Sequence, residues 1–340
     1  MNLIQINPFV SKLWDNAVLS GSSPQFFQLS SWLKVLADTY GFKPLCYTLE
    51  SDQSCTIPVL ITKSLTGKKK AIALPFSDGC NIDCRKLPHD ELVEKLLEIA
   101  KCENCKTLEF RGTTTFRPSG EPSHSYFGHV LNLTNEESLL KGLSSSKRRN
   151  IKKAQRESTT VTFHNDKDAV HQYYRLHCIT RKRHGLPPQS LEFFDSLYDN
   201  IIFPKQGEVA LAYSNNVPVA GAVYLFCGSE ALYKFGASDK SVQNLRSNDL
   251  LMWEAIRRYA QKGYKTFSFG KTESFHEGLC RFKEGFGAFR VDLNDYCYNV
   301  TTKKIVKCVP GVHGVHNVIF RRMPISFLVF IGKILYKYSA

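Results

Sequence analysis

The apolar positions of the first 140 residues alternate between helical and extended spacing. Apolar residues recur at intervals of three and four in two stretches, which predicts helices over 29–36 and 88–101. Ser30 or Ser31 could cap the first of these helices, and Gly41 ends it. Short apolar runs predict strands at 44–49, 56–62, 71–74 and 107–110. This part of the chain is therefore predicted to be α/β with mixed sheets.

A second alternation follows a break at 112–128 that is rich in Thr, Pro, Ser and Gly. It contains a predicted hairpin, in which 209–213 and 218–226 flank the turn sequence Ser214-Asn-Asn. Further strands are predicted at 231–236 and 266–269, and helices at 136–157, 168–184, 190–200, 248–262 and 324–336. Because the two halves share an order of elements, the pattern indicates a duplication.

Charge separates the two halves. Residues 1–140 contain 14 Lys and Arg against 15 Asp and Glu, whereas residues 141–340 contain 31 against 16. The whole net charge of +14 therefore comes from the second part, which favours a phosphate-bearing partner such as tRNA, a lipid-linked sugar diphosphate or an anionic membrane face. The composition, 43% hydrophobic and 22% charged, is that of a globular protein.

The strongest local charge signal lies at 147–156, where six of ten residues are basic. On a helix, Arg148, Lys152 and Arg156 would form one cationic stripe, while Ile151 would point elsewhere. Like charges at this spacing repel, so an anionic partner is the natural compensation; the alternative is a solvated surface helix. Three serines before the stripe could cap the helix. The residues predicted to bind phosphate are Lys147, Arg148, Arg149, Lys152, Lys153 and, in a later turn, Arg246.

Several stretches, spread over most of the chain, resemble the FemAB-like family of peptidoglycan-bridge aminoacyltransferases and their polysaccharide-associated relatives. They are found at 27–33, 74–79, 145–154, 181–187, 233–238, 248–256, 269–272 and 278–287. The resemblance implies an α/β fold of two tandem acetyltransferase (GNAT)-like domains, at 1–140 and 141–310. It also implies that the C-terminal segment, 311–340, can return to pack on the first domain. Fold alone does not fix chemistry.

The resemblance also implies a catalytic pair. In the family a Phe-Lys pair reaches the transfer site, and Phe282 and Lys283 match that pair. A lysine there could stabilise the charge that grows on the ester oxygen, or could hold the donor's phosphate. The alternative is a glycine-bounded turn with one exposed lysine. The chain departs from the family where Ser268 replaces an acid and Lys271 replaces an arginine, which leaves the acceptor open.

The absence of a glycine-rich phosphate-binding loop determines which acyl donor we expect. Acetyl-CoA enzymes of this fold hold the pyrophosphate on a glycine-rich loop between a strand and the next helix. The corresponding residues, 243–248, contain no glycine. We therefore expect an aminoacyl-tRNA or another activated acyl donor and no bound cofactor. Because no enzyme nucleophile stands out, direct attack by the acceptor is expected. Glu273, His276 and Glu284 are polar residues that could accept the proton.

Eleven cysteines with no secretory signal are expected to be mostly free thiols in a reducing cytosol. Zinc is the rival interpretation for Cys80, Cys84, Cys102 and Cys105, whose spacing approximates that of a zinc site. The segment 324–336 is expected to pack on the protein as a helix. The other interpretation places it on a membrane surface, with Arg321, Arg322, Lys333 and Lys337 toward lipid phosphates.

The sequence therefore predicts a cytoplasmic acyl- or aminoacyltransferase, at the inner face of the membrane if it contacts lipid. Its substrates would be an activated acyl donor and the amine or hydroxyl of a lipid-linked or nucleotide-linked envelope or polysaccharide precursor. Two alternatives stay open: an acetyl-CoA-dependent sugar N- or O-acetyltransferase, and a non-enzymatic nucleic-acid-binding module.

Overall fold

The computed structural model describes residues 1–10, 12–21, 24–80, 82, 84, 86–307 and 315–338. The chain divides into two compact units. The first unit comprises Met1–Phe127, Val291–Pro310 and Ile334–Ala340, and the second comprises Gly128–Arg290 and Gly311–Lys333. This division differs from the boundaries expected from sequence, because 128–140 and most of 311–340 belong to the second unit and 291–310 belongs to the first.

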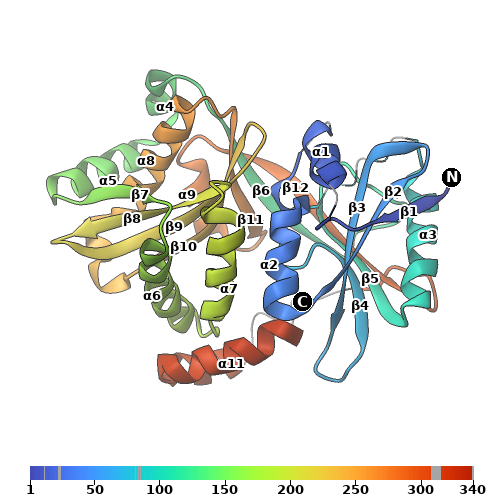
Figure 1. The fold of residues 1–340 in the computed structure, drawn as a ribbon. Coiled ribbons are helices and arrows are strands. Elements are labelled where there is room, and N and C mark those ends of the chain that lie inside the picture. The colour runs from blue at the N-terminus through green and yellow to red at the C-terminus, as the bar shows by residue number, and fades with distance from the viewer. Residues whose placement is uncertain are drawn as a thin grey trace. The chain divides into compact units, whose positions relative to one another are not determined.

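The sheet of the first unit has the strand order β1-β2-β3-β4-β5-β12. Neighbouring strands are antiparallel except β4 and β5, which are parallel. Helix α3 packs on β5, α2 on β2 and α1 on β3 (Figure 1). The bounds are β1 Leu3–Ile6, α1 Lys12–Ser20, α2 Ser30–Tyr40, β2 Lys43–Leu49, β3 Asp52–Lys63, β4 Lys69–Ala73, α3 His89–Cys102, β5 Cys105–Thr113 and β12 Phe289–Asn299; a 3₁₀ turn, η1, covers Phe26–Gln28.

Helix α2 shows how a distant residue replaces a predicted cap. It begins after Leu29, and neither Ser30 nor Ser31 caps it with its side chain. Instead Asp15 of α1 accepts from the Ser30 backbone N–H at 2.7 Å and from the Ser30 hydroxyl at 2.6 Å. The predicted serine cap is therefore wrong. The predicted end of α2 is confirmed, because Gly41 takes the left-handed φ of 69° that glycine adopts without strain.

The strand order of the second unit is β6-β11-β10-β9-β8-β7. The predicted hairpin is confirmed: β8 and β9 are antiparallel, and Asn215 and Asn216 between them have positive φ of 51° and 61°, as a two-residue hairpin turn requires. The strands are β6 His124–Asn132, β7 Thr160–His164, β8 Gly207–Ser214, β9 Val217–Cys227, β10 Glu230–Ser238 and β11 Thr266–Glu273. The helices are α4 Glu136–Gly142, α5 Ser145–Arg156, α6 Lys167–His184, α7 Leu191–Leu197, η2 Tyr198–Ile202, η3 Lys240–Leu245, α8 Ser247–Gln261, α9 Glu277–Glu284, α10 Val315–Arg322 and α11 Ile325–Tyr338.

Alternation along β9 determines which helix covers which face of this sheet. Ala220, Ala222 and Tyr224 belong to the core formed with α5 and α8, whereas Gly221 between them lies against Tyr173 of α6. Successive strand residues point to opposite faces, so α8 and α6 cover opposite sides (Figure 1). Helices α5 and α8 pack on each other, which brings the basic helix beside the start of α8.

The predicted helix at 136–157 is two helices. Helix α4 ends at Gly142, and Ser144 begins α5 by accepting from the Lys147 backbone N–H at 3.3 Å. The predicted serine cap of the basic helix is therefore confirmed. Ile151 and Ala154 are buried in the core, which leaves the cationic stripe on the outside.

Candidate functional site

A cavity of about 250 Å³ lies at the first turn of α8, inside the second unit. Its walls come from α5, β9, the end of β10, the turn 239–246, the start of α8 and α9. The residues that carry its chemistry are Lys147, Asn150, Arg246, Ser247, Asp249 and Phe282. A cationic helix, the start of a second helix and an aromatic ring therefore meet at one cavity.

The turn that leads into α8 lacks glycine but adopts a conformation that glycine usually supplies. Arg246 occupies the left-handed region at φ 61° and precedes α8 without a side-chain cap. Free backbone N–H groups at a helix start carry partial positive charge and attract anions. Because Arg246 and Ser247 both line the cavity, an anionic group placed there would meet a guanidinium and a helix N-terminus together.

Lys147 and Asp249 form a buried ion pair in the wall of this cavity. The Lys147 ammonium contacts Asp249 Oδ1, and Asn150 donates to Asp249 Oδ2 at 3.0 Å. The two side chains are 8% and 9% exposed. Burial lowers the pKa of Lys147, and although Asp249 opposes that shift, the pKa stays below its usual value. Asp249 would repel an anion at the helix start, so its neutralisation by Lys147 keeps the site receptive.

Aromatic rings complete the setting of Lys147. Its Nζ lies 3.6 Å from the centroid of the Phe282 ring and 4.6 Å from that of Phe286. Cations are attracted to the faces of such rings, most strongly where water is excluded. The ion pair and the Phe282 ring therefore hold each other in position at the cavity wall.

The other predicted phosphate contacts lie outside this cavity. Arg148, Arg149 and Lys152 are exposed and Lys153 is half-buried. A surface groove of about 570 Å³ is lined by Arg149, Lys152, Gln155 and Arg156. The structure thus separates Lys147, which is buried and paired, from a row of cations on the outer face of α5. Phosphate binding by these residues stays a prediction.

Lys283 lies in a different place from its neighbour Phe282. Phe282 lines the cavity, whereas Lys283 is 2% exposed and is not part of that lining. The Lys283 ammonium donates to the Thr272 hydroxyl at 2.6 Å and to the Gly270 carbonyl at 3.0 Å. Adjacent residues on a helix point about 100° apart, which explains how one side chain enters the cavity and the next one the core. The exposed lysine of the turn interpretation is therefore wrong, and the catalytic role of Lys283 stays a prediction.

The surroundings of Lys283 include a histidine that the sequence did not single out. His129 of β6 is fully buried, and its Nε2 lies 3.8 Å from Glu284 Oε1. Burial and the nearby Lys283 ammonium lower the pKa of His129 to about 4, so the ring is neutral at neutral pH. Glu284 also forms an ion pair with Arg290. The sequence around His129 contains no recognisable motif. Its position in a strand is therefore the only signal that could have marked it as a buried residue near the site.

Ser268, where the family has an acid, is turned toward its own strand. Its hydroxyl accepts from the Gly270 backbone N–H at 3.3 Å. Glu273, the last residue of β11, and His276, which directly precedes α9, both lie outside the lining of the cavity at α8. The geometry of that cavity therefore does not place a proton acceptor among these residues.

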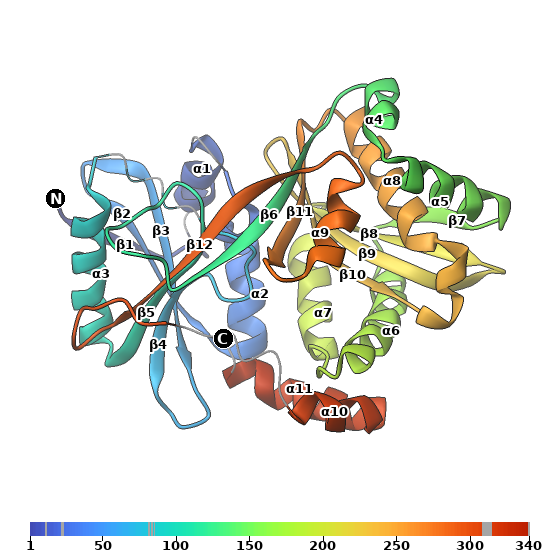
Figure 2. The ribbon, with the colours of Figure 1, turned by 180° about the vertical axis from the view of Figure 1, so that it is seen from behind.

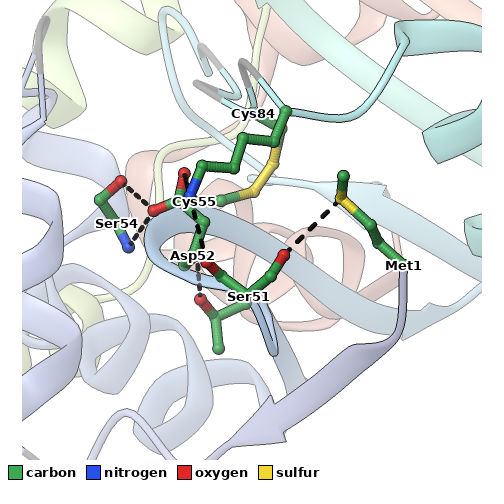
Figure 3. The surroundings of a disulfide bond; sticks show 8 residues. Met1, Ser51, Asp52, Ser54, Cys55 and Cys84 are labelled. Atoms are coloured by element: carbon green, nitrogen blue, oxygen red, sulfur yellow. Dashed lines mark hydrogen bonds and ion pairs between the residues drawn. A yellow bond between two sulfur atoms is a disulfide. The ribbon is translucent and has the colours of Figure 1, made fainter.

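The cysteines differ from the expectation in one pair. Cys55 of β3 and Cys84 form a disulfide, with Cα atoms 4.9 Å apart, close to Asp52 and Ser54 (Figure 3). Because Cys84 is in this disulfide, it cannot serve as a ligand in the rival zinc interpretation, and no group of three or more His, Cys, Asp or Glu is arranged to hold a metal ion among the described residues. The free cysteines within the described ranges are Cys46, Cys80, Cys102, Cys105, Cys178, Cys227, Cys280 and Cys297.

Comparison with known proteins places this site within a recognised domain. Residues 145–284, from the start of α5 to the end of α9, match the acetyltransferase (GNAT) domain family. A stretch of 106 residues, 28% of the chain, is 27% identical to a lipid II:glycine glycyltransferase of Staphylococcus haemolyticus. The enzyme of that name from Staphylococcus aureus is 24% identical over 106 residues. The chain spans about a quarter of the length of these curated relatives.

Solved structures extend the likeness to nearly the whole chain. The crystal structure of FemX matches with a TM-score of 0.67 and 16% identity, covering 89% of this chain and 98% of that one. The chain is FemAB-like in sequence and in fold. A tandem GNAT protein of the clavulanic acid pathway matches with a TM-score of 0.50 and 9% identity, covering 88% of this chain and 98% of that one. The predicted fold class, two tandem acetyltransferase-like domains of mixed α/β structure, is confirmed.

The matched domain of this FemAB-like protein contains both the cavity and the buried Lys283. The first residue of the match lies at the start of the basic helix, and the last one is Glu284, beside Lys283. As for membrane insertion, the described part of the FemAB-like chain contains no helix with the length and apolarity needed to cross a bilayer.

Proposed function

We propose that this FemAB-like protein is an acyl- or aminoacyltransferase that acts on an amine or hydroxyl of a lipid-linked or nucleotide-linked envelope precursor. The observation that carries the proposal is the cavity at the start of α8, where Arg246, the helix N-terminus and Phe282 meet. The named activity of the curated relatives, transfer of glycine to lipid II, supports the same chemistry. The enzyme would act in the cytoplasm, at the membrane face where such precursors are anchored.

In the proposed reaction the acceptor attacks the donor directly. The nitrogen or oxygen lone pair of the acceptor adds to the carbonyl carbon of the donor ester, and the alkoxide of the donor leaves. The proton that the acceptor loses passes to that leaving oxygen, so no external acid or oxidant is needed. The protein would contribute by holding the two reactants together, which can supply much of the rate enhancement.

Each part of the site has a proposed task. Arg246 and the α8 N-terminus would hold a phosphate of the donor, and Phe282 would form the wall against which the acyl group lies. Lys283 would fix the position of α9 through its bonds to Gly270 and Thr272, and so place Phe282. The exposed cations Arg148, Arg149, Lys152 and Lys153 would attract the remaining phosphates of tRNA or of the acceptor.

Acetyl-CoA fits this site less well than an aminoacyl ester. The pyrophosphate of coenzyme A is usually held by bare backbone N–H groups of a glycine-rich turn. Here Arg246, Ser247 and Asn248 all place side chains around the cavity. Stabilisation of the protein by coenzyme A alone, measured as a shift of the melting temperature, would contradict the proposed donor.

The decisive test is transfer from mixed aminoacyl-tRNAs, charged with labelled amino acids, to a lipid-linked or nucleotide-linked muramyl peptide. We expect Phe282→Ala to lower kcat/KM about a hundredfold, because the acyl group loses its wall. Phe289→Ala, at a phenylalanine that is 48% exposed just beyond α9, is the matched control and should retain transfer. Equal activity of Phe282→Ala and the control would refute the proposed site.

The basic helix is tested separately by affinity. Arg149→Gln combined with Lys152→Gln should raise KM for the anionic reactant about tenfold at low salt and leave kcat unchanged, because these exposed cations attract charge without contacting the reacting atoms. Lys101→Gln, at an exposed lysine in the last turn of α3, is the control. An effect that persists at high salt would show that the two residues act in some other way.

A further inference from the structure

Helices α10 and α11 expose a row of large apolar side chains. Four of them, Val318, Ile319, Phe327 and Phe330, are 53%, 52%, 58% and 61% exposed. Exposed apolar residues are ordinary when scattered, but a group on two consecutive helices marks an interaction surface. Figures 1 and 2 show α11 along the edge of the second unit beyond α6 and α7, away from the strands.

The inner face of each helix is already used for packing. Asn317 of α10 is buried and donates to the His184 carbonyl at the end of α6. In α11, Leu328 is fully buried and Gly332 lies against the backbone of Pro188. Phe327 and Phe330 point away from these residues, since positions one before Leu328 and two after it fall on the far side of the helix. The exposed apolar row is therefore a second face, which the described part of the chain leaves uncovered.

The charged side chains of this part of the sequence have one sign. Residues 301–340 contain seven Lys and Arg and no Asp or Glu. Arg321 and Arg322 end α10, beside Val318 and Ile319, and both are exposed. The Lys333 ammonium on α11 is paired with Glu192 of α7, which ties the helix to the body of the second unit.

We propose that α10 and α11 form a docking surface for an anionic lipid bilayer, with the phenylalanines inserted among the acyl chains and the arginines beside the phosphates. Helices that combine an apolar stripe with flanking Arg and Lys lie in the plane of the interface, and each basic residue adds attraction to anionic lipid. A second copy of this chain is less well matched, because two such surfaces would bring like charges together. The inference stands on these helices and is independent of the proposed transfer.

The first experiment measures sedimentation of the purified full chain with vesicles. We expect stronger binding to vesicles of phosphatidylcholine mixed with phosphatidylglycerol than to vesicles of phosphatidylcholine alone, with part of it retained at high salt. Failure to bind the anionic vesicles would overturn the proposal. Hydrogen exchange of the unaltered protein should show new protection in α10 and α11 when these vesicles are added, and protection confined to α5 would equally overturn it.

Matched variants identify the apolar contact. Phe327→Ser combined with Phe330→Ser should weaken binding to anionic vesicles at least about tenfold, because two rings no longer leave water. Phe203→Ser is the control, since Phe203 is 68% exposed elsewhere in the second unit. If the double variant bound the anionic vesicles as strongly as the control does, the proposal would be wrong. So would a shift from dimer to monomer caused by the two serines, because a second copy would then cover this face.

The charge contribution has its own variant. Arg321→Gln combined with Arg322→Gln should weaken binding to the anionic vesicles about tenfold and change binding to neutral vesicles little. Transfer to a water-soluble acceptor should persist in all of these variants, which separates failure of the docking surface from failure of the proposed reaction. Equal losses on neutral and anionic vesicles would contradict a phosphate contact of the arginines.

Discussion

Each unit of this FemAB-like protein has a carboxylate buried in an ion pair, Glu109 in the first and Asp249 in the second, and the surroundings of these two pairs differ. In the first unit Glu109 of β5 contacts Arg111 at 2.6 Å and Lys70 at 3.5 Å. Burial alone would raise the pKa of Glu109, but the two cations lower it below its usual value. Arg111 and Lys70 remain 24% and 35% exposed, so water still reaches the cations of this pair.

In the second unit neither partner has that access to water. Lys147 and Asp249 are both nearly enclosed, and they form part of the wall of a cavity at a helix start. Burial of a charge therefore does not by itself mark a functional site. A site is indicated where the buried pair also faces an unoccupied space that a helix dipole and an aromatic ring share.

The largest expected effect comes from breaking the pair in the second unit. Asp249→Ala should lower the free energy of unfolding by about 3–5 kcal/mol, because the Lys147 ammonium would stay buried without a counter-ion. Urea denaturation measures the loss. Combining Lys147→Met with Asp249→Leu should return most of it, since both charges are then gone. If Asp249→Ala lowered the free energy of unfolding no more than the double variant does, an unpaired buried Lys147 would carry no extra cost. The contrast between the two units would then be wrong.

The disulfide provides a prediction for the first unit. Replacement of both Cys55 and Cys84 by alanine should lower the free energy of unfolding of that unit by about 3 kcal/mol, because the cross-link restricts the unfolded chain. Tryptophan fluorescence in a Trp253→Phe background reports on the first unit through Trp14 and Trp32. Cys102→Ser, at an exposed free thiol, is the control. Equal destabilisation of the second unit would show that the two units do not unfold separately.

Acid should affect the second unit before the first. Burial, with Arg181 nearby, lowers the pKa of His177 from 6.5 to about 3, so the folded state holds it neutral while the unfolded state takes up a proton. Its stabilising contribution is therefore complete above pH 6.5 and is lost as the pH falls toward 3, on the order of 2–4 kcal/mol in total.

The corresponding window of the first unit is lower. Glu109 has a pKa below its ordinary 4.5, so its contribution is complete above pH 4.5 and is lost only under more acid conditions. Unfolding measured through Trp253 should therefore move toward lower urea from about pH 6 downward, ahead of the signal from Trp14 and Trp32. The reverse order would contradict the assignment of a neutral, buried His177.

The smallest expected effect is at the solvated pair. Glu109→Gln should cost about 1–2 kcal/mol, since Arg111 and Lys70 can be hydrated when the carboxylate is lost. Transfer activity should be unchanged, because the residue lies in the first unit, outside the lining of the cavity at α8. A cost that matches the one at Asp249 would mean that solvent access does not separate the two pairs.

Local sequence signals predicted much of the fold. The hairpin turn at Asn215 and Asn216 and the helix α8, predicted at 248–262, follow from residues close together in the chain. The basic helix α5 and its serine cap were also predicted, but its separation from α4 was not, because the spacing of apolar residues over 136–157 is that of one continuous helix.

Contacts between distant residues could not be predicted in this way. Strand β12 pairs with β5 across nearly 200 positions, and the sequence does not specify this partner. The same applies to the Cys55–Cys84 disulfide and to the Asp249 partner of Lys147. The motif that suggested Phe282 and Lys283 was informative about position only, since the directions of the two side chains depend on how α9 packs against β11.

Gly332 determines how closely α11 can pack against the second unit. Any Cβ at this position would overlap the carbonyl oxygen of Pro188, so the helix can approach the body of the second unit this closely only because the side chain is a hydrogen atom. One added methyl group would therefore force this turn of α11 away from Pro188 without altering a single solvent-facing residue. A substitution at Gly332 would therefore change how α11 packs on its own protein while leaving unchanged the residues that we propose contact the lipid bilayer.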